Sequence, residues 1–397
     1  MLISAREAAR RLGVKPATLY AYVSRGLMRS APGADSRERR YYEEDVARLK
    51  RLRHAGPRTG APPKPFDSLS PVLDTSLGPI EGGRLYYRGI DACVLADSAD
   101  LEAVAQLLWG QAAIARFQIE HLQRELRRLL AGARLPPAAM DRARAILVGL
   151  ATHDVGALDV SAPAVARTGS RLVRALAAAV TGAMPTKEPV HRQLANAWSL
   201  DDEAADLVRR CLVLAADHEL NASTYVGRCI ASTGASPYAV ILGALGALSG
   251  PRHGGETSKV EVLLREVLGT GNVQSAVAER LQRGERIPGF GQPLYPDGDP
   301  RAAHILDAVK ASRHRRHCEG ALRVGHEISE LIGRHPNVDF ALGLVSVVLK
   351  LPPGSGLGMF LIGRSVGWIA HAIEQYATGV LIRPRARYVG IVPELEP

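Results

Sequence analysis

Two histidines stand in segments whose composition suits a ligand site. His218 lies within the stretch 217–224 (DHELNAST), and His253 lies within 250–255 (GPRHGG), where it is flanked by glycines. Glycine lets the backbone come close to a ligand and adopt turns that other residues resist. With a carboxylate and several arginines further along the chain, the two imidazoles suggest chemistry on a substrate that carries a carbonyl and carboxylate groups.

Five more short motifs follow these two in order. They are IPGFGQ (287–292), GDPRA (298–302), HPNVD (335–339), GRSVGWIAH (363–371) and LIRPR (381–385). Together with an earlier YYRG turn (86–89), the motifs resemble the citrate synthase family over roughly residues 70–395. The resemblance implies a mostly α-helical homodimer that condenses a coenzyme A thioester with a 2-oxo dicarboxylate.

The resemblance also implies a role for each polar group near the thioester. A Claisen-type condensation removes a weakly acidic proton beside a thioester carbonyl, so it needs a carboxylate base and a hydrogen-bond donor for the developing enolate. By family position, Asp339 is the base and His253 is the donor to the thioester oxygen. His218 matches the histidine that hydrogen-bonds the oxo-acid.

Three arginines match the carboxylate-binding positions of the family: Arg301, Arg364 and Arg383, the last reaching into the site of a partner subunit. Guanidinium suits this task because its forked donors can bind a carboxylate through two parallel hydrogen bonds. The acyl-CoA would be a co-substrate, and we expect no permanently bound cofactor and no metal ion.

Each of these residues also has a plainer interpretation. A single histidine is often an ordinary core or surface residue, and only the glycine-flanked motif favours a ligand role for His253. Asp339 could instead cap a helix, since Asn337 and Asp339 both suit the N-cap position. Arg383 has two other arginines close by that could take its place.

Gln292 is the clearest departure from the family pattern, which has at this position a histidine that polarises the ketone of oxaloacetate. A glutamine amide can donate a hydrogen bond but cannot become cationic or pass on a proton. If the histidine supplies acid catalysis, its loss costs on the order of 10²–10⁴ in rate. Two later positions that are often basic in the family, near the coenzyme, are Pro293 and Pro296 here. We therefore expect reduced or altered activity.

The chain must fold so that these distant motifs meet. Its 397 residues exceed the ~250–300 at which a single core usually stops growing, so two or more domains are expected. Leu and Ala recur at helical spacing from residue 100 onward, which predicts a mainly α fold after a short β-hairpin with strands over 72–77 and 84–87. The resemblance divides this part into a large helical domain (71–253 and 343–397) and a small one (254–342) that closes over the substrates.

Cysteine usage and apolar runs indicate the compartment. The four cysteines show no CxxC or other metal-ligand spacing, which suggests buried thiols in a reducing compartment. No signal-peptide pattern opens the chain, and the apolar runs are broken well short of a ~20-residue span. We expect a cytoplasmic protein without a membrane helix.

The N-terminal segment differs from the rest in charge. Residues 1–64 contain 15 Lys+Arg and 6 Asp+Glu, a net +9, whereas the remaining residues contain 35 and 34, a net +1. Ser4 and Glu7 form a capping-box pattern before a short helix, and Pro16 suits the first turn of a second helix. Residues 1–54 resemble the winged helix-turn-helix of MerR-type regulators.

In such a domain the second helix and the wing face DNA. Candidate phosphate contacts are Arg25, Arg39 and Arg40, together with Arg29 and Arg37, and candidate base-edge contacts are Thr18 and Tyr20. The alternative is a solvated basic face on a docking or dimerisation domain. A Pro/Gly-rich linker is predicted over 55–70. A second basic run, 313–317, suits either a solvated helix face or contact with coenzyme A phosphates.

The sequence thus favours a citrate synthase-like acyltransferase, with acetyl-CoA and oxaloacetate as first substrates to test and propionyl-CoA as a methylcitrate-type variant. The rival from another class is a DNA-binding transcriptional regulator whose weakened enzyme domain senses a metabolite. A third hypothesis makes the N-terminal domain an assembly or docking module.

Overall fold

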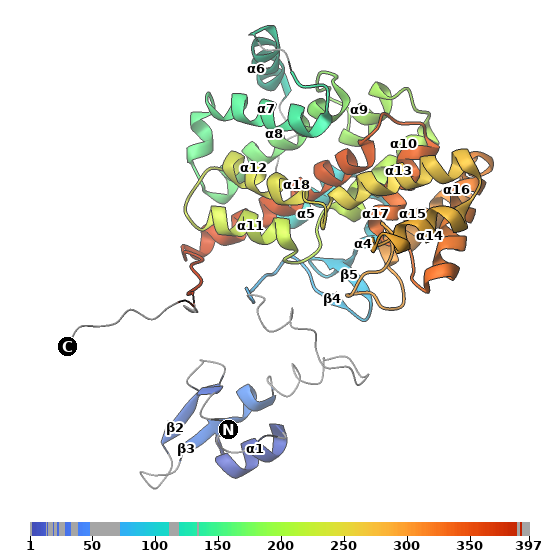
Figure 1. Cartoon of the computed structure of the whole chain (residues 1–397). Helices are drawn as coiled ribbons and strands as arrows, with labels where there is room; N and C mark the ends of the chain where they lie inside the picture. The colour runs from blue at the N-terminus through green and yellow to red at the C-terminus, as the bar shows by residue number, and fades with distance from the viewer. Residues whose placement is uncertain are drawn as a thin grey trace. The chain divides into compact units, whose positions relative to one another are not determined.

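A computed structural model describes residues 2–12, 14, 19, 22–23, 28–32, 39–47, 72–110, 119–132, 135–386 and 390. The chain forms two compact units, Met1–Leu73 and Asp74–Pro397 (Figure 1). The linker predicted over 55–70 lies outside the described residues.

The first unit contains a three-stranded antiparallel sheet in the order β1-β3-β2. Its elements are β1 (Leu2–Ser4), α1 (Ala5–Leu12), β2 (Ser30–Pro32) and β3 (Arg39–Tyr42). The amide of Glu7 donates to Oγ of Ser4 at 3.2 Å, which is the N-terminal half of the expected capping box. Leu12 of α1, Leu19, Tyr41 and Val46 share a small buried core. β3 lies within residues 37–42, which the sequence suggests as the wing, and it pairs with β2.

The second unit opens with three short strands and continues as helices. The strands are β4 (Ile80–Glu81), β5 (Arg84–Tyr87) and β6 (Ile90–Asp91). The helices before the centre of the unit are α4 (Ala92–Ser98), α5 (Leu101–Trp109), α6 (Ile119–Gly132), α7 (Ala139–Ala151), the 3₁₀ helix η1 (Val155–Leu158), α8 (Ala162–Thr181), α9 (Val190–Ala197) and α10 (Asp202–Ala215). The later helices are α11 (Ala222–Ala231), α12 (Pro237–Leu248), α13 (Gly255–Thr270), α14 (Val273–Gln282), α15 (Pro300–Ala311), α16 (Arg315–Ile332), α17 (Val338–Val348) and α18 (Ser355–Thr378).

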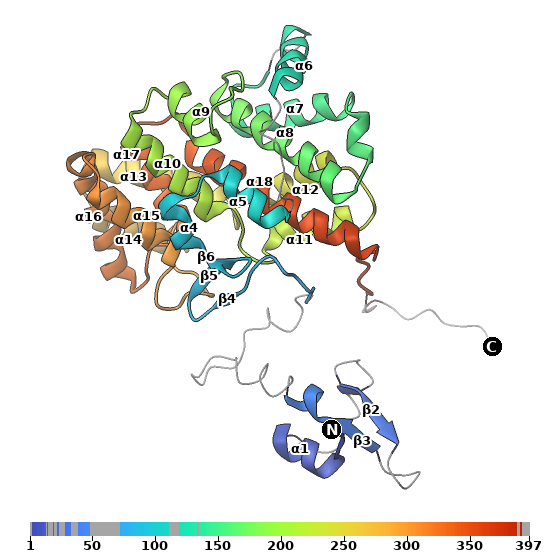
Figure 2. The ribbon, with the colours of Figure 1, turned by 180° about the vertical axis from the view of Figure 1, so that it is seen from behind.

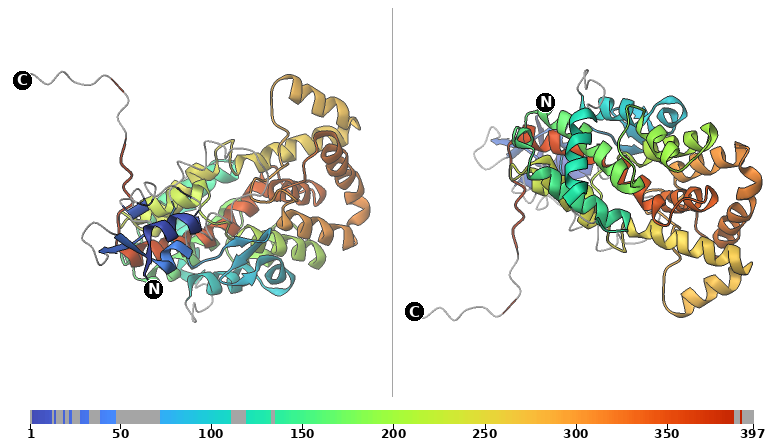
Figure 3. Two further views of the ribbon diagram at one scale, coloured as in Figure 1. Left: turned by 90° about the horizontal axis from the view of Figure 1, so that it is seen from below. Right: turned by 90° about the horizontal axis from the view of Figure 1, so that it is seen from above.

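Helix α18 runs through the middle of the helical body, as views from opposite sides, from below and from above show (Figures 2 and 3). It packs against α5, α8, α10, α11, α12 and α17. By length and composition it could cross a membrane, yet 94% of its apolar stretch is buried by the surrounding helices, as in a core helix. The expectation that every apolar run is too short to span a membrane was therefore wrong for α18, although its apolar surface is used inside the fold.

Two glycines let α18 touch the end of α10. A Cβ at Gly363 would lie 2.5 Å from the carbonyl oxygen of Leu212, and one at Gly367 would lie 2.3 Å from that of Ala216. The amide of Gly367 donates to this same Ala216 carbonyl at 3.0 Å. Arg364 stands between the two glycines, so this close approach sets its position beside the loop that contains His218.

The mainly α class and a short N-terminal hairpin are confirmed, but the strand that pairs with β5 is β4, and the predicted first strand over 72–77 is wrong. One continuous hydrophobic core runs from Leu77 to Ala370 and includes residues from both the large and the small domain that the sequence predicts. The division of the second unit at residues 254 and 342 stays a prediction.

Candidate active site

His253 stands immediately before α13, in a tight turn. Its amide donates to the carbonyl of Gly250 at 3.0 Å, and its own carbonyl accepts the amide of Glu256 at 2.9 Å. The ring lies edge-on to Phe360 of α18, with 6.1 Å between centroids. Burial, with the nearby Arg364 charge, lowers the pKa of His253 to about 4. The imidazole is therefore neutral at pH 7 and carries one N–H.

Ser223 of α11 decides which nitrogen of His253 can meet a substrate. Nε2 of His253 lies 2.8 Å from Oγ of Ser223, and Oγ also accepts the indole N–H of Trp368 at 3.2 Å. The serine has one hydrogen, which can go to Nε2 or to Oδ1 of Asn221 at 2.8 Å. When it goes to Nε2, the imidazole proton is on Nδ1, which leaves His253 a hydrogen-bond donor to a ligand.

Asp339 is the second residue of α17, and the structure decides against its role as the helix cap. Asn337 is the N-cap, since its side-chain oxygen accepts the amides of Asp339 at 3.0 Å and Phe340 at 3.3 Å. The Asp339 carboxylate accepts the hydroxyl of Thr257 from α13. Burial raises the pKa of Asp339 to about 6, against the opposing effect of the Thr257 hydrogen bond. A carboxylate with this pKa is a stronger base than an ordinary aspartate and is still ionised at pH 7.

His218 lies in the loop between α10 and α11. The next residue, Glu219, has a φ of +49°, in a region that residues other than glycine rarely adopt. Nε2 of His218 lies 3.0 Å from the hydroxyl oxygen of Tyr295. Burial and the charges of Arg301 and Arg364 lower the pKa of His218 well below its ordinary value. The imidazole is neutral and buried, as a hydrogen-bonding group beside a cationic site would be.

Arg301 is fixed by a carboxylate two residues before it. Its Nε and Nη2 donate to the two oxygens of Asp299 at 2.9 and 2.7 Å, and both side chains are buried. Asp299 also accepts the amide of Val338 at 3.1 Å, which ties the start of α15 to the start of α17 beside Asp339. Arg301 thus has its charge balanced before any ligand binds.

Arg364 has no such counter-ion at hydrogen-bonding distance among the residues described. Its Nε donates to the carbonyl of Ala215 at 2.7 Å and its guanidinium lies 4.8 Å from the ring centroid of Phe360. Its buried Nη2 has no hydrogen-bond partner in the described part of the chain. Burial lowers the pKa of Arg364 to about 10, so it remains cationic at neutral pH. A buried cation with a free donor is suited to an anionic ligand.

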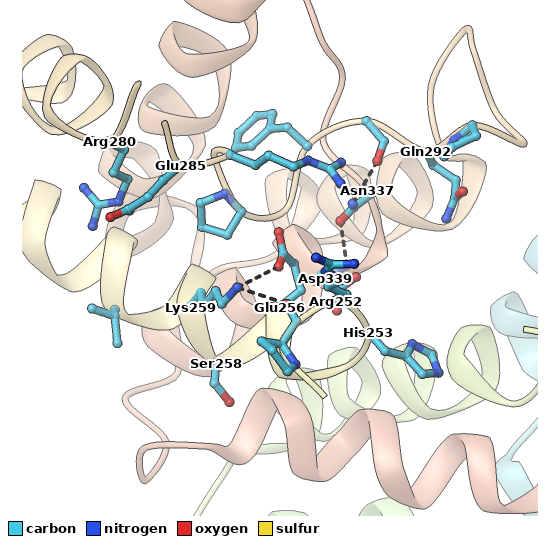
Figure 4. A pocket seen from close by; sticks show the side chains of 17 residues that line it. Arg252, His253, Glu256, Ser258, Lys259, Arg280, Glu285, Gln292, Asn337 and Asp339 are labelled. Carbon is cyan, nitrogen blue, oxygen red and sulfur yellow. Dashed lines mark hydrogen bonds and ion pairs between the residues drawn. The ribbon is translucent and has the colours of Figure 1, made fainter. Parts of the chain in front are cut away.

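Three predicted catalytic residues line one cavity of about 1040 Å³: His253, Gln292 and Asp339 (Figure 4). The segment before Gln292 turns sharply at Gly289, whose φ is +83° and whose added Cβ would meet Val260 at 2.6 Å. The Gln292 amide makes no hydrogen bond to the residues described. The buried His218, Arg301 and Arg364 do not line this cavity, but the charge of Arg364 acts on both His218 and His253.

Arg383 and the basic run 313–317 lie apart from this group. Arg383 is exposed, in an extended segment after α18, and does not line the cavity. Arg313 pairs with Asp201 at 2.9 Å and Glu203 at 3.1 Å, which favours the solvated-face interpretation of the run. Among the described residues, no group of three or more His, Cys, Asp or Glu side chains could hold a metal ion.

Four residues that contact the predicted site residues were missed by reasoning from the sequence: Ser223, Thr257, Tyr295 and Asp299. Each acts through a predicted site residue, by orienting His253, Asp339, His218 or Arg301 respectively. Ser223 and Asp299 lie inside motifs that were recognised, so their positions were available. Thr257 and Tyr295 stand outside the quoted motifs and had no such signal.

Comparison with known proteins gives separate matches for the N-terminal part of the chain and for the helical part. Residues 69–385 match the family model described as citrate synthase, C-terminal domain. The chain belongs to the citrate synthase family. Residues 3–55 match the model of the MerR HTH family regulatory protein, so this citrate synthase-type chain also carries an N-terminal MerR-like helix-turn-helix domain.

Individual relatives agree with the family assignment. Putative citrate synthase 2 of Mycobacterium tuberculosis is 42% identical over 188 residues, 46% of this chain, and the match spans only 50% of that relative. Citrate synthase 2 of Bacillus subtilis is 30% identical over 347 residues, 80% of this chain and 93% of the relative. The crystal structure of citrate synthase from Thermotoga maritima superposes with a TM-score of 0.65 at 28% identity, covering 82% of this chain and 96% of that one.

Proposed function

We propose that the chain condenses acetyl-CoA or propionyl-CoA with oxaloacetate or a similar 2-oxo dicarboxylate to form a citrate-like tricarboxylate. The observation that carries the proposal is that Asp339, at the start of α17, and His253, before α13, line the same cavity. One is a carboxylate whose pKa is raised and the other is a neutral imidazole with a serine on its second nitrogen. A thioester between them would meet a base on one side and a donor on the other.

The reaction uses these groups in sequence. The Asp339 carboxylate takes a proton from the carbon beside the thioester carbonyl, and the N–H of His253 stabilises the enolate oxygen. The enolate carbon then forms the new bond to the ketone carbon of the oxo-acid, whose carboxylates are held by Arg364 and Arg301. Water finally cleaves the thioester, which releases coenzyme A as the thiol.

Gln292 alters one part of this sequence. Its amide N–H can hydrogen-bond the ketone oxygen as negative charge develops there, but it cannot supply the proton. The proton for the new hydroxyl then has to come from another donor, so turnover is slower than a histidine in the same place would allow. This explanation supports a reduced rate rather than a lost reaction.

Release of free thiol tests the proposal directly. Purified protein is incubated with acetyl-CoA or propionyl-CoA and a panel of oxo-acids, beside Asp339→Asn and His253→Ala variants whose melting temperatures are unchanged. We expect thiol release that depends on an oxo dicarboxylate and falls at least about 100-fold in either variant. Release that persists equally in Asp339→Asn would contradict the role of this carboxylate.

A homodimer and closure of the small domain belong to the same proposal. α12 contains no charged residue, and Tyr225, Val226 and Ile230 of α11 and Leu242 of α12 are only partly buried. A second copy would cover this apolar face. It would also bring the partner's exposed C-terminal segment, with Arg383, towards the oxo-acid site. Analytical sedimentation should give the mass of a dimer. Arg383→Ala should weaken binding of the oxo-acid and leave the dimer intact.

A second candidate function, regulation of transcription in the cytoplasm, is supported by the N-terminal domain. Arg40 is exposed and forms no ion pair with the residues that the structure describes, and Arg39 donates to Oγ of Ser30 at 3.0 Å. Arg29 is paired with Asp45 at 2.9 Å, which makes it a weaker phosphate ligand. Thr18, Tyr20 and Arg25 lie outside the described residues. The affinity for duplex DNA should fall steeply as the salt concentration rises, and it should be lower in Arg40→Ala. If the protein shows no salt-sensitive DNA binding, regulation of transcription is ruled out and the docking hypothesis remains.

A further inference from the structure

The proposed function leaves the phosphates of the thioester substrate without a binding site. Coenzyme A carries a 3′-phosphate and a pyrophosphate, and such groups are usually held by Arg, Lys or helix N-termini. The two positions after Gln292 that would be basic by family resemblance are Pro293 and Pro296, which have no cationic side chain. A cationic surface elsewhere on the cavity would have to replace them.

The cavity that contains Asp339 and His253 has such a surface. Its lining includes four cations: Arg252, Lys259, Arg280 and Arg286. Arg280 is bound to Glu266 by two ion-pair contacts, so its charge is already balanced. The other three cations are exposed at the cavity.

The anions of the same cavity do not cancel these charges. Glu256 lies 3.4 Å from Lys259, whose ammonium also donates to the carbonyl of Pro251 at 3.0 Å. Glu285 is held at 2.7 Å by Arg283, which does not line the cavity. Within the described part of the chain, Arg252 and Arg286 have no carboxylate partner. Arg252, Lys259 and Arg286 are called the cationic rim of the cavity. Arg252 and Arg286 are uncompensated, and Lys259 is only weakly paired.

Lys259 is separated from Gln292 and His253 within the cavity, whereas Arg252 lies beside Asp339 (Figure 4). Figure 4 shows Lys259, Glu285 and Arg280 towards one end of the cavity and Gln292 and His253 towards the other. Arg286 follows Glu285 directly in the chain. The volume of about 1040 Å³ is at the upper end of the ~300–1,000 Å³ usual for small-molecule sites, as an extended ligand with a remote charged end requires.

We propose that Arg252, Lys259 and Arg286 bind the phosphates of the coenzyme A thioester, in place of the missing cations at Pro293 and Pro296. The inference rests on the proposed function for the identity of the ligand. Arg252 precedes His253 and Lys259 lies in the first turns of α13, so both are fixed to the element that positions the donor for the thioester.

Binding of coenzyme A to the full chain tests the inference without requiring turnover. Calorimetric titrations with coenzyme A and with 3′-dephospho-coenzyme A are compared for the natural protein, Arg252→Gln, Lys259→Gln, Arg286→Gln and the Arg252→Gln/Arg286→Gln double variant. Each single variant should raise the Kd for coenzyme A about 5-fold to 30-fold, and at least one should lose the preference over the dephospho form. Arg323→Gln is the matched control, because Arg323 is an exposed arginine of α16 that does not line the cavity.

The outcomes separate this inference from the proposed function. If the variants bind coenzyme A as tightly as the natural protein, or the control weakens binding equally, the rim assignment is overturned while condensation can stand. If the rim variants weaken binding yet the natural protein releases no thiol with any oxo-acid, the rim stands and the condensation does not. Failure of the natural protein to bind coenzyme A at millimolar concentration would overturn both.

Discussion

The hydroxyl oxygen of Tyr295 lies 3.0 Å from Nε2 of His218, and the two rings meet edge-on with 5.5 Å between centroids. Burial raises the pKa of the Tyr295 phenol and lowers the pKa of the His218 imidazole, so both groups are neutral at physiological pH. This contact occupies one nitrogen of His218. Only Nδ1 is then left for the oxo-acid.

Tyr295→Phe should weaken binding of the oxo-acid because it removes the group that fixes the His218 ring. A buried hydrogen bond is worth about 0.5–1.5 kcal/mol, so we expect a rise in KM for oxaloacetate of roughly 3-fold to 10-fold. The KM for the acyl-CoA should not change, since Tyr295 does not line the coenzyme cavity. Steady-state kinetics with each substrate varied in turn make the comparison. Equal increases in both constants would indicate a general loss of structure instead.

Gln292→His should increase the rate of condensation. The natural amide polarises a ketone but cannot deliver a proton, whereas imidazole can do both, and general acid catalysis contributes on the order of 10²–10⁴. The thiol-release assay compares kcat for the two proteins, and Gln292→Asn serves as the control for shortened reach without a new titrating group. No gain, or a loss, in Gln292→His would mean that the cavity is adapted to the amide.

The rate should rise with pH through about 6, because Asp339 must lose its proton to act as the base. Its pKa is raised to about 6 by burial, while that of His253 is lowered to about 4, so His253 stays neutral across this range. A profile of kcat/KM between pH 4.5 and 8 reports the free-enzyme group. A kcat/KM that is already nearly constant from pH 4.5 upward would contradict the raised pKa of Asp339.

Thr257→Val is a matched variant for the same measurement of kcat/KM against pH. The Thr257 hydroxyl donates to the carboxylate and lowers the pKa of Asp339, so its removal should move the limb to higher pH. Valine keeps the shape of threonine, which limits the change in packing around α13. An unmoved limb would show that the titrating group is not Asp339.

The sequence predicted that some of the site residues lie together, but not how each is held in place. The motifs were enough to predict that His253 and Asp339 share a site, and the two residues line the same cavity. It could not show that Asn337, rather than Asp339, caps α17, since both suit that position until the backbone is known. Nor could it show that Asp299 balances Arg301, which depends on side-chain geometry at the start of α15.

Arg364→Met should remove the stabilisation that oxaloacetate gives. Arg364 has a buried Nη2 without a partner, so an anion that binds there lowers the free energy of the folded state alone. Thermal unfolding with and without oxaloacetate should show a rise in Tm for the natural protein and none for Arg364→Met. Arg301→Met is expected to differ, because it would leave Asp299 buried without its partner and lower Tm even without ligand. A ligand-induced rise that survives in Arg364→Met would place the anion elsewhere.

Gly367→Ala should destabilise the fold and weaken oxo-acid binding together. Its Cβ would lie 2.3 Å from the Ala216 carbonyl and 2.7 Å from Oδ1 of Asp217, so α18 would have to move away from the loop that precedes His218. Overpacking of this kind costs about 1–3 kcal/mol and should lower Tm by several degrees. Gly269→Ala is the control, because Gly269 of α13 has open space around it and alanine favours a helix by roughly 0.5–1 kcal/mol. We expect opposite shifts in Tm for the two substitutions, and altered oxaloacetate binding only in Gly367→Ala. This result would establish that the contact between α18 and α10 positions the site. Equal shifts in Tm would refute it.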